Sequence, residues 1–201
     1  MSFLVVGRMI ELTGYDTELF RFINGLSGHS SFIDEVLSII ASDYLMPVVT
    51  GSILLYLWLT AGKSIFKRYN VILCLLSMAV ATSIVFVCNV FYYRERPFML
   101  DDVNVLFYMP TDSSFPSNIA AGLSALSLPI ALTHKKLCAG ALICCLLVCL
   151  SRVYVGIHYP LDIFAGFFIG FGSFYIVKKL FKITNPINNL IILVTKKLRL
   201  V

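Results

Sequence analysis

Five long stretches of this sequence contain no charged residue, and they decide what the chain can fold into. They cover residues 44–62, 69–93, 113–133, 137–151 and 163–177, without a single Asp, Glu, Lys or Arg. A helix needs roughly 20 apolar residues to cross a bilayer core, so the first three runs suffice alone and the last two need their flanks. The sequence therefore predicts an all-α, polytopic transmembrane helix bundle of five spans.

The two ends of the chain differ from these runs. The first 43 residues are interrupted by charges and contain no signal-peptide core, which favours helices lying along the outer membrane interface. The end, from Pro186, combines an apolar body with basic residues and predicts an interfacial helix on the inner face. A sixth, tilted span is the alternative for either segment. No repeat or linker is evident, so residues 1–201 are expected to form a single domain.

Basic residues indicate the orientation, because cytoplasmic loops carry the excess of Lys and Arg. They gather after the first, third and fifth runs: Lys63, Lys67, Arg68, Lys135, Lys136, Lys178, Lys179 and Lys182. These loops and the C-terminus are therefore expected in the cytoplasm, and the other loops outside. The net charge of +5 then reflects a multi-pass protein of the cell membrane and no nucleic-acid partner.

Cysteine offers no sign of a metal centre or of disulfide chemistry. All six cysteines fall inside predicted spans, and none has the Cys or His spacing that holds a metal: Cys74, Cys88, Cys138, Cys144, Cys145 and Cys149. They are interpreted as reduced core residues, and no metal or other cofactor is expected.

Polar residues collect at the outer ends of the spans. The two outer loops bring together three arginines, two small polar residues, a histidine and an aspartate: Arg94, Arg96, Ser117, Asn118, Arg152, His158 and Asp162. Such a set can bind a phosphate and transfer it. His158 lies four residues before Asp162, with Pro160 able to start a helix between them. The carboxylate could then hold one ring nitrogen and leave the other free to attack phosphorus.

These residues resemble the signature of the type-2 phosphatidic acid phosphatase superfamily. That signature has three parts: K, six residues, RP; then PSGH; then SR, five residues, H, three residues, D. The third part is complete as Ser151, Arg152, His158 and Asp162. The first keeps Arg96 and Pro97 but has Asn89 in place of lysine, and the second reads Pro116, Ser117, Asn118 and Ile119. The resemblance spans about residues 16 to 177.

The segment TELFRFINGLSGHSSFIDEVLSIIASDY is similar to the start of the undecaprenyl diphosphate phosphatases. This resemblance implies a lipid substrate, the diphosphate of the carrier of cell-wall precursors, cleaved on the outer face of the membrane. It also implies that His158 forms a phospho-histidine and that Asp162 orients it. Arg96 and Arg152 would bind the phosphate with Ser117, and no metal would be needed, because arginines neutralise its charge.

The departure at Ile119 removes the histidine that would protonate the leaving group. A positioned general acid contributes about 10²- to 10⁴-fold to the rate. A lipid monophosphate must expel an alkoxide, whereas a lipid diphosphate expels a phosphate with a pKa of about 6, which is stable as an anion. The loss should therefore harm a monophosphatase more than a diphosphatase, and slow water activation in both.

Four further residues are auxiliary candidates. His29 could reach the site from the N-terminal segment and replace the missing histidine, although an exposed His more often has no catalytic role. Arg94 could cover for the missing lysine or contact lipid headgroups, and Asn89 and Ser151 stand within the motifs. His134 is expected on the inner side, away from the site.

Three functions are compatible with these residues. The first is a polyprenyl diphosphate phosphatase. The second is a phosphatase of lipid monophosphates, such as phosphatidic acid or phosphatidylglycerol phosphate. The third is a degenerate relative that binds or transports a lipid phosphate without cleaving it, which the replacements Ile119 and Asn89 favour and the intact pair of His158 and Asp162 opposes. The oligomeric state has no signal in the sequence.

Overall fold

The computed structural model describes residues 14–183, and all regular elements within that range are helices. They are residues 14–24, α2 (Ser31–Ile40), α3 (Leu45–Thr60), α4 (Ile65–Phe91), the short 3₁₀ helix η1 (Pro97–Met99), α5 (Asn118–Ala131), α6 (Lys135–Tyr154) and α7 (Pro160–Ile183). The predicted all-α class is confirmed for this part of the chain.

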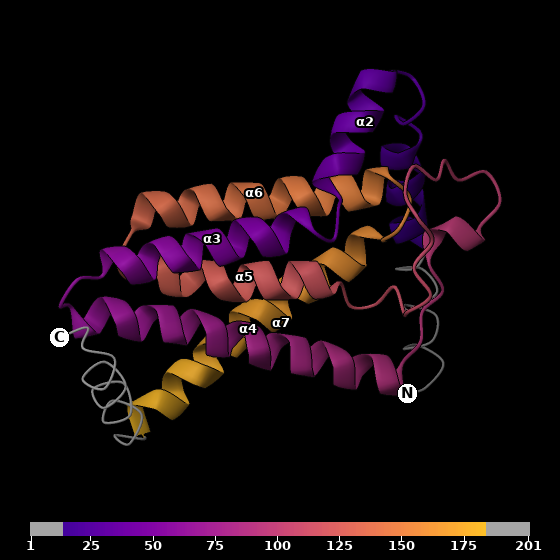
Figure 1. Ribbon diagram of the computed structural model, residues 1–201. Helices are drawn as coiled ribbons and strands as arrows, with labels where there is room; N and C mark the ends of the chain where they lie inside the picture. The colour runs from indigo at the N-terminus through magenta and orange to yellow at the C-terminus, as the bar shows by residue number, and fades with distance from the viewer. Residues whose placement is uncertain (1–13, 184–201) are drawn as a thin grey trace.

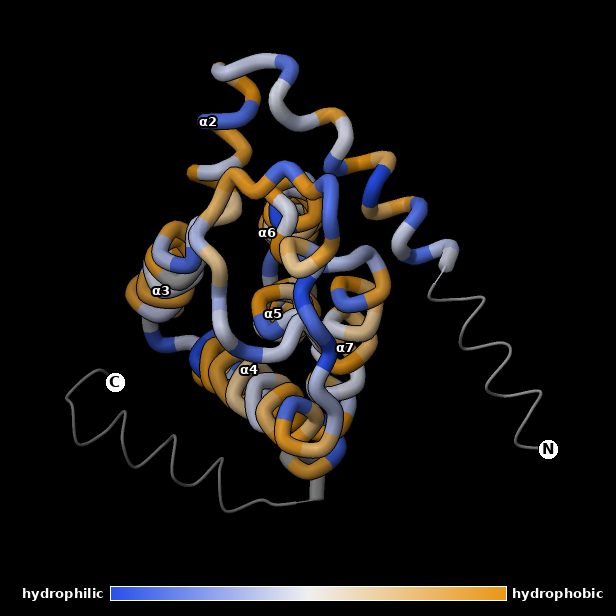
Figure 2. Tube along the Cα trace, turned by 90° about the vertical axis from the view of Figure 1, so that its right-hand side faces the viewer, coloured by the Kyte–Doolittle hydropathy of each residue, from blue (hydrophilic) through white to orange (hydrophobic). Residues whose placement is uncertain are grey.

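The helices α3 to α7 form a bundle with α5 at its centre (Figures 1 and 2). α5 packs against α4, α6 and α7, and α3 packs on α4. The connections 92–117 and 155–159 lie at one end of the bundle, beside α2 and the helix 14–24 (Figure 1). We call this the loop end; the connections α3–α4 and α5–α6 form the opposite end.

Glycines allow α7 to approach α5 closely. A Cβ at Gly170 would lie 2.0 Å from Ser124 Oγ and 2.4 Å from the backbone oxygen of Ala121. A Cβ at Gly166 would lie 2.6 Å from the backbone oxygen of Ser117. These contacts leave no room for a side chain, so both positions require glycine for the observed packing. Through this contact α7 is placed directly against the beginning of α5.

The lengths of the helices differ from the lengths of the charge-free runs. Three helices are long and apolar enough to cross a membrane, namely Ile65–Phe91, Lys135–Tyr154 and Pro160–Leu180, while Val48–Thr60 and Asn118–Ala131 are shorter apolar helices. The expectation that run 113–133 forms a full span was wrong at its start, because residues 113–117 are not helical. The 14 residues of α5 measure about 21 Å, which is shorter than the roughly 30 Å of a bilayer core.

The N-terminal segment contains short helices at the loop end. α2 points away from the bundle, roughly across the direction of the long helices (Figure 1), and it contributes no buried residue. Its exposed side chains include Phe32, Ile33 and Ile39, which suits a helix at a membrane interface. Residues 14–43, the described part of this segment, contain no helix of span length. The interfacial helix predicted from Pro186 lies outside the described residues.

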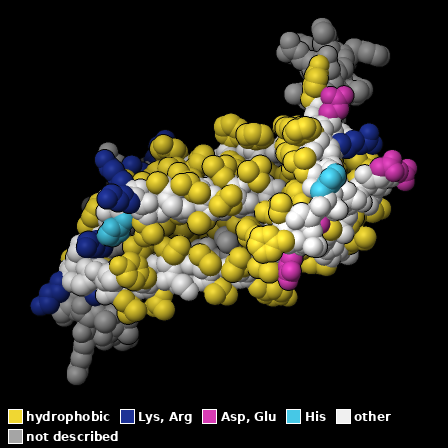
Figure 3. Space-filling model, turned by 90° about the horizontal axis from the view of Figure 1, so that it is seen from above, with side chains coloured by type: hydrophobic (Ala, Val, Ile, Leu, Met, Phe, Trp, Pro, Cys, Tyr) yellow, Lys and Arg dark blue, Asp and Glu magenta, His cyan; other side chains and the backbone are white. Residues whose placement is uncertain are grey.

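Charge is distributed unevenly between the two ends of the bundle. On the face drawn in Figure 3, most Lys and Arg side chains lie at one end, and the Asp and Glu side chains lie toward the other. Hydrophobic side chains cover the surface between them on this face. The exposed large hydrophobic residues of the long helices include Phe86, Leu147 and Phe168. Exposed apolar area of this kind marks a lipid-facing flank in a bundle of apolar helices.

Candidate active site

A pocket of about 110 Å³ opens at the loop end of the bundle. Residues from six separate segments line it: Asp43, Asn89, Arg96, Tyr108, Pro110, Asp112, Ser113, Pro116, Asn118, Ile119, Arg152 and His158. We call it the arginine pocket. The structure thus brings together two arginines, the histidine and the start of α5, as the sequence predicted from the order of the spans.

Two buried guanidinium groups face this pocket. Arg96 donates to the backbone oxygens of Ile157 (2.8 Å) and Asp112 (3.0 Å) and pairs with Asp112 Oδ1 at 2.8 Å. Arg152 donates to the backbone oxygen of Ala41 (3.0 Å) and to Asp43 Oδ1 (2.7 Å). The backbone contacts fix both side chains, and fixed guanidinium groups suit a multivalent oxyanion such as phosphate.

His158 is held with its Nε2 atom unprotonated. The Nδ1 atom lies 2.9 Å from the backbone oxygen of Ser114, and a carbonyl oxygen only accepts, so Nδ1 carries the hydrogen. Burial lowers the pKa of His158 to about 4, and the positive charges of Arg152 and Arg96 act in the same direction, against the opposing effect of the nearby Asp162 carboxylate. The imidazole is therefore neutral near pH 7, with a lone pair on Nε2.

Asp162 acts on the imidazole less directly than the sequence predicted. Its Oδ2 atom lies 3.6 Å from His158 Nδ1, beyond hydrogen-bond distance. Instead, Oδ2 accepts from Ser114 Oγ (2.5 Å) and from the backbone N–H of Tyr159 (2.8 Å). Ser114 therefore connects the two residues, because its hydroxyl binds the carboxylate and its carbonyl oxygen binds the imidazole.

Arg94 belongs to a buried ion-pair network and does not line the arginine pocket. Its guanidinium pairs with Asp162 Oδ1 (2.7 Å) and Asp16 Oδ2 (2.6 Å) and lies 4.0 Å from the ring centre of Tyr159. Asp16 also accepts from the backbone N–H of Leu161 at 2.9 Å. Burial raises the pKa of Asp16 even though Arg94 opposes the shift. Neither predicted role of Arg94, lysine substitute or headgroup contact, matches this position.

The first turn of α5 forms one wall of the pocket. Asn118 and Ile119 line it, whereas Ser117 is fully buried and does not. The Oγ atom of Ser117 instead accepts from the backbone N–H of Ala120 (3.5 Å), as an N-cap. Asn89, where the family motif has lysine, also lines the pocket, and its Oδ1 has no hydrogen-bond partner within residues 14–183.

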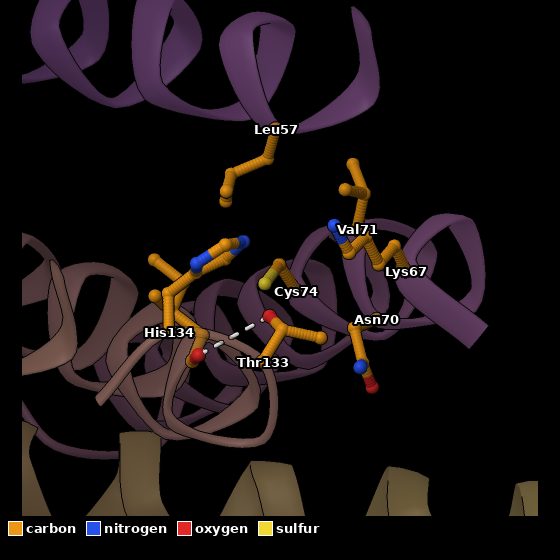
Figure 4. A pocket seen from close by; sticks show the side chains of 8 residues that line it. Leu57, Lys67, Asn70, Val71, Cys74, Thr133 and His134 are labelled. Carbon is orange, nitrogen blue, oxygen red and sulfur yellow. Dashed lines mark hydrogen bonds between the residues drawn. The ribbon is translucent and has the colours of Figure 1, made fainter. Parts of the chain in front are cut away.

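The remaining auxiliary candidates lie away from the pocket. Ser151 is buried and donates to the backbone oxygen of Val148 at 2.7 Å. His29 is exposed, with its Nδ1 atom 3.3 Å from the backbone oxygen of Ser27, and is not a lining residue. Figure 4 shows His134 in a cavity of about 10 Å³ between α3, α4 and α5, at the opposite end of the bundle. That cavity has room for about one water molecule.

Sequence reasoning gave no role to four polar residues at this site: Asp43, Asp112, Ser113 and Ser114. The two aspartates stand directly before charge-free runs, at the same end of the bundle as His158, and this position was a usable signal. Ser113 and Ser114 come from the long connection 92–117, whose path no local pattern predicts. Tyr108 is one of several tyrosines whose pattern indicates an interfacial aromatic belt, with donation to the substrate as the alternative, and it lines the pocket. Within residues 14–183, no group of three or more His, Cys, Asp or Glu side chains could hold a metal ion.

Comparisons with known proteins agree with this geometry. The sequence matches the PAP2 superfamily over residues 70–185. It is 32% identical over 146 residues to the undecaprenyl-diphosphatase BcrC of Bacillus subtilis, which covers 73% of this chain and 74% of that protein. The crystal structure of Aquifex aeolicus LpxE is similar, with a TM-score of 0.64 and 28% identity over 81% of this chain and 93% of that chain.

A second solved structure is similar over most of its length. The transmembrane PAP2-type phosphatidylglycerolphosphate phosphatase of Bacillus subtilis has a TM-score of 0.62 and 25% identity, covering 91% of this chain and 94% of that chain. The helical bundle, the arginine pocket and these similarities define a multi-pass membrane protein of the lipid phosphatase class. The chain belongs to the PAP2 superfamily, and the resemblance read from its motifs is confirmed.

Proposed function

We propose that this protein removes the terminal phosphate of a polyprenyl diphosphate, such as undecaprenyl diphosphate, through a phospho-histidine intermediate. One observation carries the proposal: His158, neutral and with its Nε2 lone pair available, lines a pocket that also contains Arg96 and Arg152. A nucleophile beside two fixed cations is the arrangement that phosphoryl transfer requires.

The terminal phosphate would bind between the two guanidinium groups and the first turn of α5. The first N–H groups of a helix have no partners within the helix and favour anions. Asn118 and Ile119 occupy these positions and line the pocket. The arginines would neutralise the phosphate charge, so the proposal includes no metal ion.

In the first step, Nε2 of His158 attacks phosphorus and the bond to the bridging oxygen breaks. The leaving group is a polyprenyl monophosphate, whose pKa of about 6 makes it stable as an anion near neutrality. Ile119, which lines the pocket, cannot donate a proton to it. A lipid monophosphate would instead expel an alkoxide without help, so the pocket favours diphosphates. Water then attacks the phospho-histidine and releases phosphate.

An apolar cavity supports a substrate with a long hydrocarbon tail. It measures about 220 Å³, lies between α3, α5 and α6, and contains Ile53, Leu123, Leu126 and Ala141 among its lining residues. Leu123 and Leu126 follow Ile119 by four and seven residues, on the same face of α5. One helix face thus leads from the arginine pocket to the apolar cavity.

The proposal places the arginine pocket at the outer face of the cell membrane and the C-terminus in the cytoplasm. The gathering of Lys and Arg toward the opposite end of the bundle supports this orientation. We further propose that residues 1–201 act as one membrane-embedded domain. The relative named undecaprenyl-diphosphatase, at 32% identity, supports the choice of substrate.

Phosphate release by the purified full-length protein in detergent tests the proposal. Undecaprenyl diphosphate and phosphatidic acid would be compared side by side with EDTA present, for the wild type and for His158→Ala. We expect release from the diphosphate, abolished in His158→Ala, and much slower release from phosphatidic acid. Equal rates on both lipids would support the alternative of a lipid monophosphatase, to which the solved phosphatidylglycerolphosphate phosphatase points. Release from neither lipid, with tight binding of both, would mean a lipid-phosphate binding or transport protein.

A further inference from the structure

Asp43 and Tyr108 form a hydrogen-bonded pair at the wall of the arginine pocket. Asp43 lies in the turn between α2 and α3, and Tyr108 lies in the connection 92–117, so the fold alone brings them together. The Tyr108 hydroxyl donates to Asp43 Oδ2, and Asp43 Oδ1 accepts from Arg152 Nη1 at 2.7 Å. The carboxylate therefore lies between a phenol and one of the two guanidinium groups.

Asp43 is ionised and Tyr108 is neutral in this pair, which allows the pair to accept a proton. Burial raises the pKa of Asp43, but the hydrogen bonds from Tyr108 and Arg152 outweigh it, and the net pKa lies below the usual value. The hydrogen bond to Asp43 raises the pKa of Tyr108. The proton therefore stays on the phenol and the carboxylate stays ionised. An ionised carboxylate accepts protons, and a phenol bonded to it is a poor acid.

We propose that the Asp43–Tyr108 pair is the general base that activates water for hydrolysis of the phospho-histidine. The inference rests on the proposed function, and it assigns a role that Ile119 cannot perform. Tyr108 is 57% exposed and lines the pocket, so its hydroxyl can contact both water and the interior. Asp43 accepts the proton of the Tyr108 hydroxyl.

The second step then proceeds as follows. The water oxygen attacks phosphorus, the P–N bond to His158 breaks, and its electron pair returns to Nε2. One water proton moves to Tyr108 Oη while the Tyr108 proton moves to Asp43 Oδ2. Hydrogen phosphate leaves, and Asp43 releases its proton to solvent. Tyr108 stays neutral throughout, so no phenolate forms beside the carboxylate.

The phosphoenzyme itself strengthens the base. In the resting pocket Arg152 is paired with Asp43, which lowers the basicity of the carboxylate. A phosphoryl group on His158 would share Arg152 and add negative charge nearby, and both effects raise the pKa of Asp43. The base therefore becomes effective after the first step, which for a diphosphate needs no acid. This order explains how a pocket with Ile119 could complete a catalytic cycle.

The test separates the two chemical steps with a polyprenyl diphosphate that carries a radioactive terminal phosphate. Tyr108→Phe removes one hydroxyl from an exposed ring that packs against Phe107, so folding should be retained. Tyr93→Phe is the matched control, because Tyr93 is an exposed tyrosine in the same connection and does not line the arginine pocket. Rapid quenching measures release of polyprenyl monophosphate in the first turnover, and labelled phospho-histidine and phosphate thereafter.

We expect Tyr108→Phe to release polyprenyl monophosphate in a first-turnover burst at the wild-type rate. Steady-state release of phosphate should fall by about 10²-fold, and labelled phospho-histidine should accumulate on nearly every molecule. Asp43→Asn should give the same pattern, and Tyr93→Phe should match the wild type.

Two results would overturn the inference while leaving the proposed function intact. One is a Tyr108→Phe variant that turns over like Tyr93→Phe; the other is a variant slowed equally in both steps without accumulation of phospho-histidine. A wild type that cleaves the diphosphate without ever labelling His158, or does not cleave it, would instead refute the proposed function.

Discussion

The neighbours of His158 determine its tautomer and its protonation state. The carbonyl oxygen of Ser114 holds the hydrogen on Nδ1, and Asp162 holds the hydroxyl of the same serine. A protonated imidazole would have no lone pair for phosphorus, so burial, which disfavours the charged ring, keeps His158 in the form that the proposed mechanism requires. At this scale, the position of one proton decides whether the site can start its reaction.

We expect His158 to remain neutral in mildly acidic solution. Burial lowers its pKa from 6.5 to about 4, so at about pH 5.5 the folded protein should carry the Nδ1–H tautomer. Nitrogen-15 NMR of histidine-labelled protein, assigned with His158→Gln, measures this. Because the unfolded chain binds a proton below about 6.5 that the native site does not, stability should also fall as the pH decreases through this window. A His158 resonance that titrates near pH 6.5 would contradict the buried, neutral assignment.

Replacing Ile119 should change which lipids the protein cleaves. Ile119→His would place a proton donor in the arginine pocket and should raise phosphatidic acid hydrolysis by about 10²-fold, with a smaller effect on a diphosphate. Ile119→Gln, which is polar but no acid, is the control. Phosphate release from both lipids measures the ratio, and an equal gain on both lipids, or an equal gain in Ile119→Gln, would refute the leaving-group argument.

Sequence motifs predicted part of this site well. Arg152 lies in the last turn of α6, while Arg96 follows α4 and His158 precedes α7 by a few residues. Their positions relative to the helix ends therefore place all three at a similar depth, where they line the pocket. The motif also named Ser117, but its hydroxyl caps α5 inside the bundle. Ser114 could not be predicted, since its two contacts depend on the path of a long connection and not on a helical period.

Among the elements, α5 and α7 determine the geometry of the site together. The backbone N–H of Ser117 donates to the backbone oxygen of Asp162 at 3.0 Å, which ties the start of α5 to the first turn of α7. Gly166 and Gly170 let the two helices approach closely enough for this bond. A side chain between the helices would therefore disturb both packing and catalysis.

The two helix glycines Gly170 and Gly172 should respond very differently to alanine. Gly170→Ala places a Cβ 2.4 Å from the backbone oxygen of Ala121, so the helices must separate; we expect a loss of about 1–3 kcal/mol of unfolding free energy and reduced activity. Gly172→Ala meets nothing within 4 Å and should be neutral or slightly stabilising. Thermal unfolding in detergent and phosphate release check both, and equal effects would refute the close-packing interpretation.

The lengths of the helices were harder to predict from the sequence than the number of apolar helices. The five apolar runs correspond to five helices, but the run at 113–133 includes the non-helical residues 113–117. Conversely, α6 continues past residue 151, where the charge-free run 137–151 ends, and includes Arg152 and Tyr154. Both side chains are buried at the site, so the charge of Arg152 does not mark the end of the helix. Absence of charge indicates burial in an apolar environment, and it does not by itself indicate helix.

For the whole molecule, the distribution of charge predicts the orientation in the membrane. The apolar flank lies between a Lys- and Arg-rich end and the loop end that contains the arginine pocket (Figures 1 and 3). Because Lys and Arg are retained in the cytoplasm, the loop end should face outside. A substrate in the outer leaflet would then reach the pocket from the membrane.

Cysteine labelling in intact cells tests this orientation. Asp101→Cys, in the exposed part of the connection 92–117, should react with a membrane-impermeant maleimide. Lys136→Cys, exposed at the opposite end, should react only after the membrane is permeabilised. The unmodified protein, whose six cysteines lie in the apolar helices, gives the background. The reverse labelling pattern would place the pocket in the cytoplasm.

The carboxylate of Asp16 has a consequence for biogenesis. It binds Arg94 and the backbone N–H of Leu161, so the first described helix contributes to holding the beginning of the last one. Chains are synthesised and fold from the N-terminus, so these groups meet only after α7 has emerged and inserted. Until then the Asp162 carboxylate is not in place beside Ser114 and His158. We therefore expect phosphate release only from chains in which the whole bundle has assembled, and none from a chain that has inserted only in part.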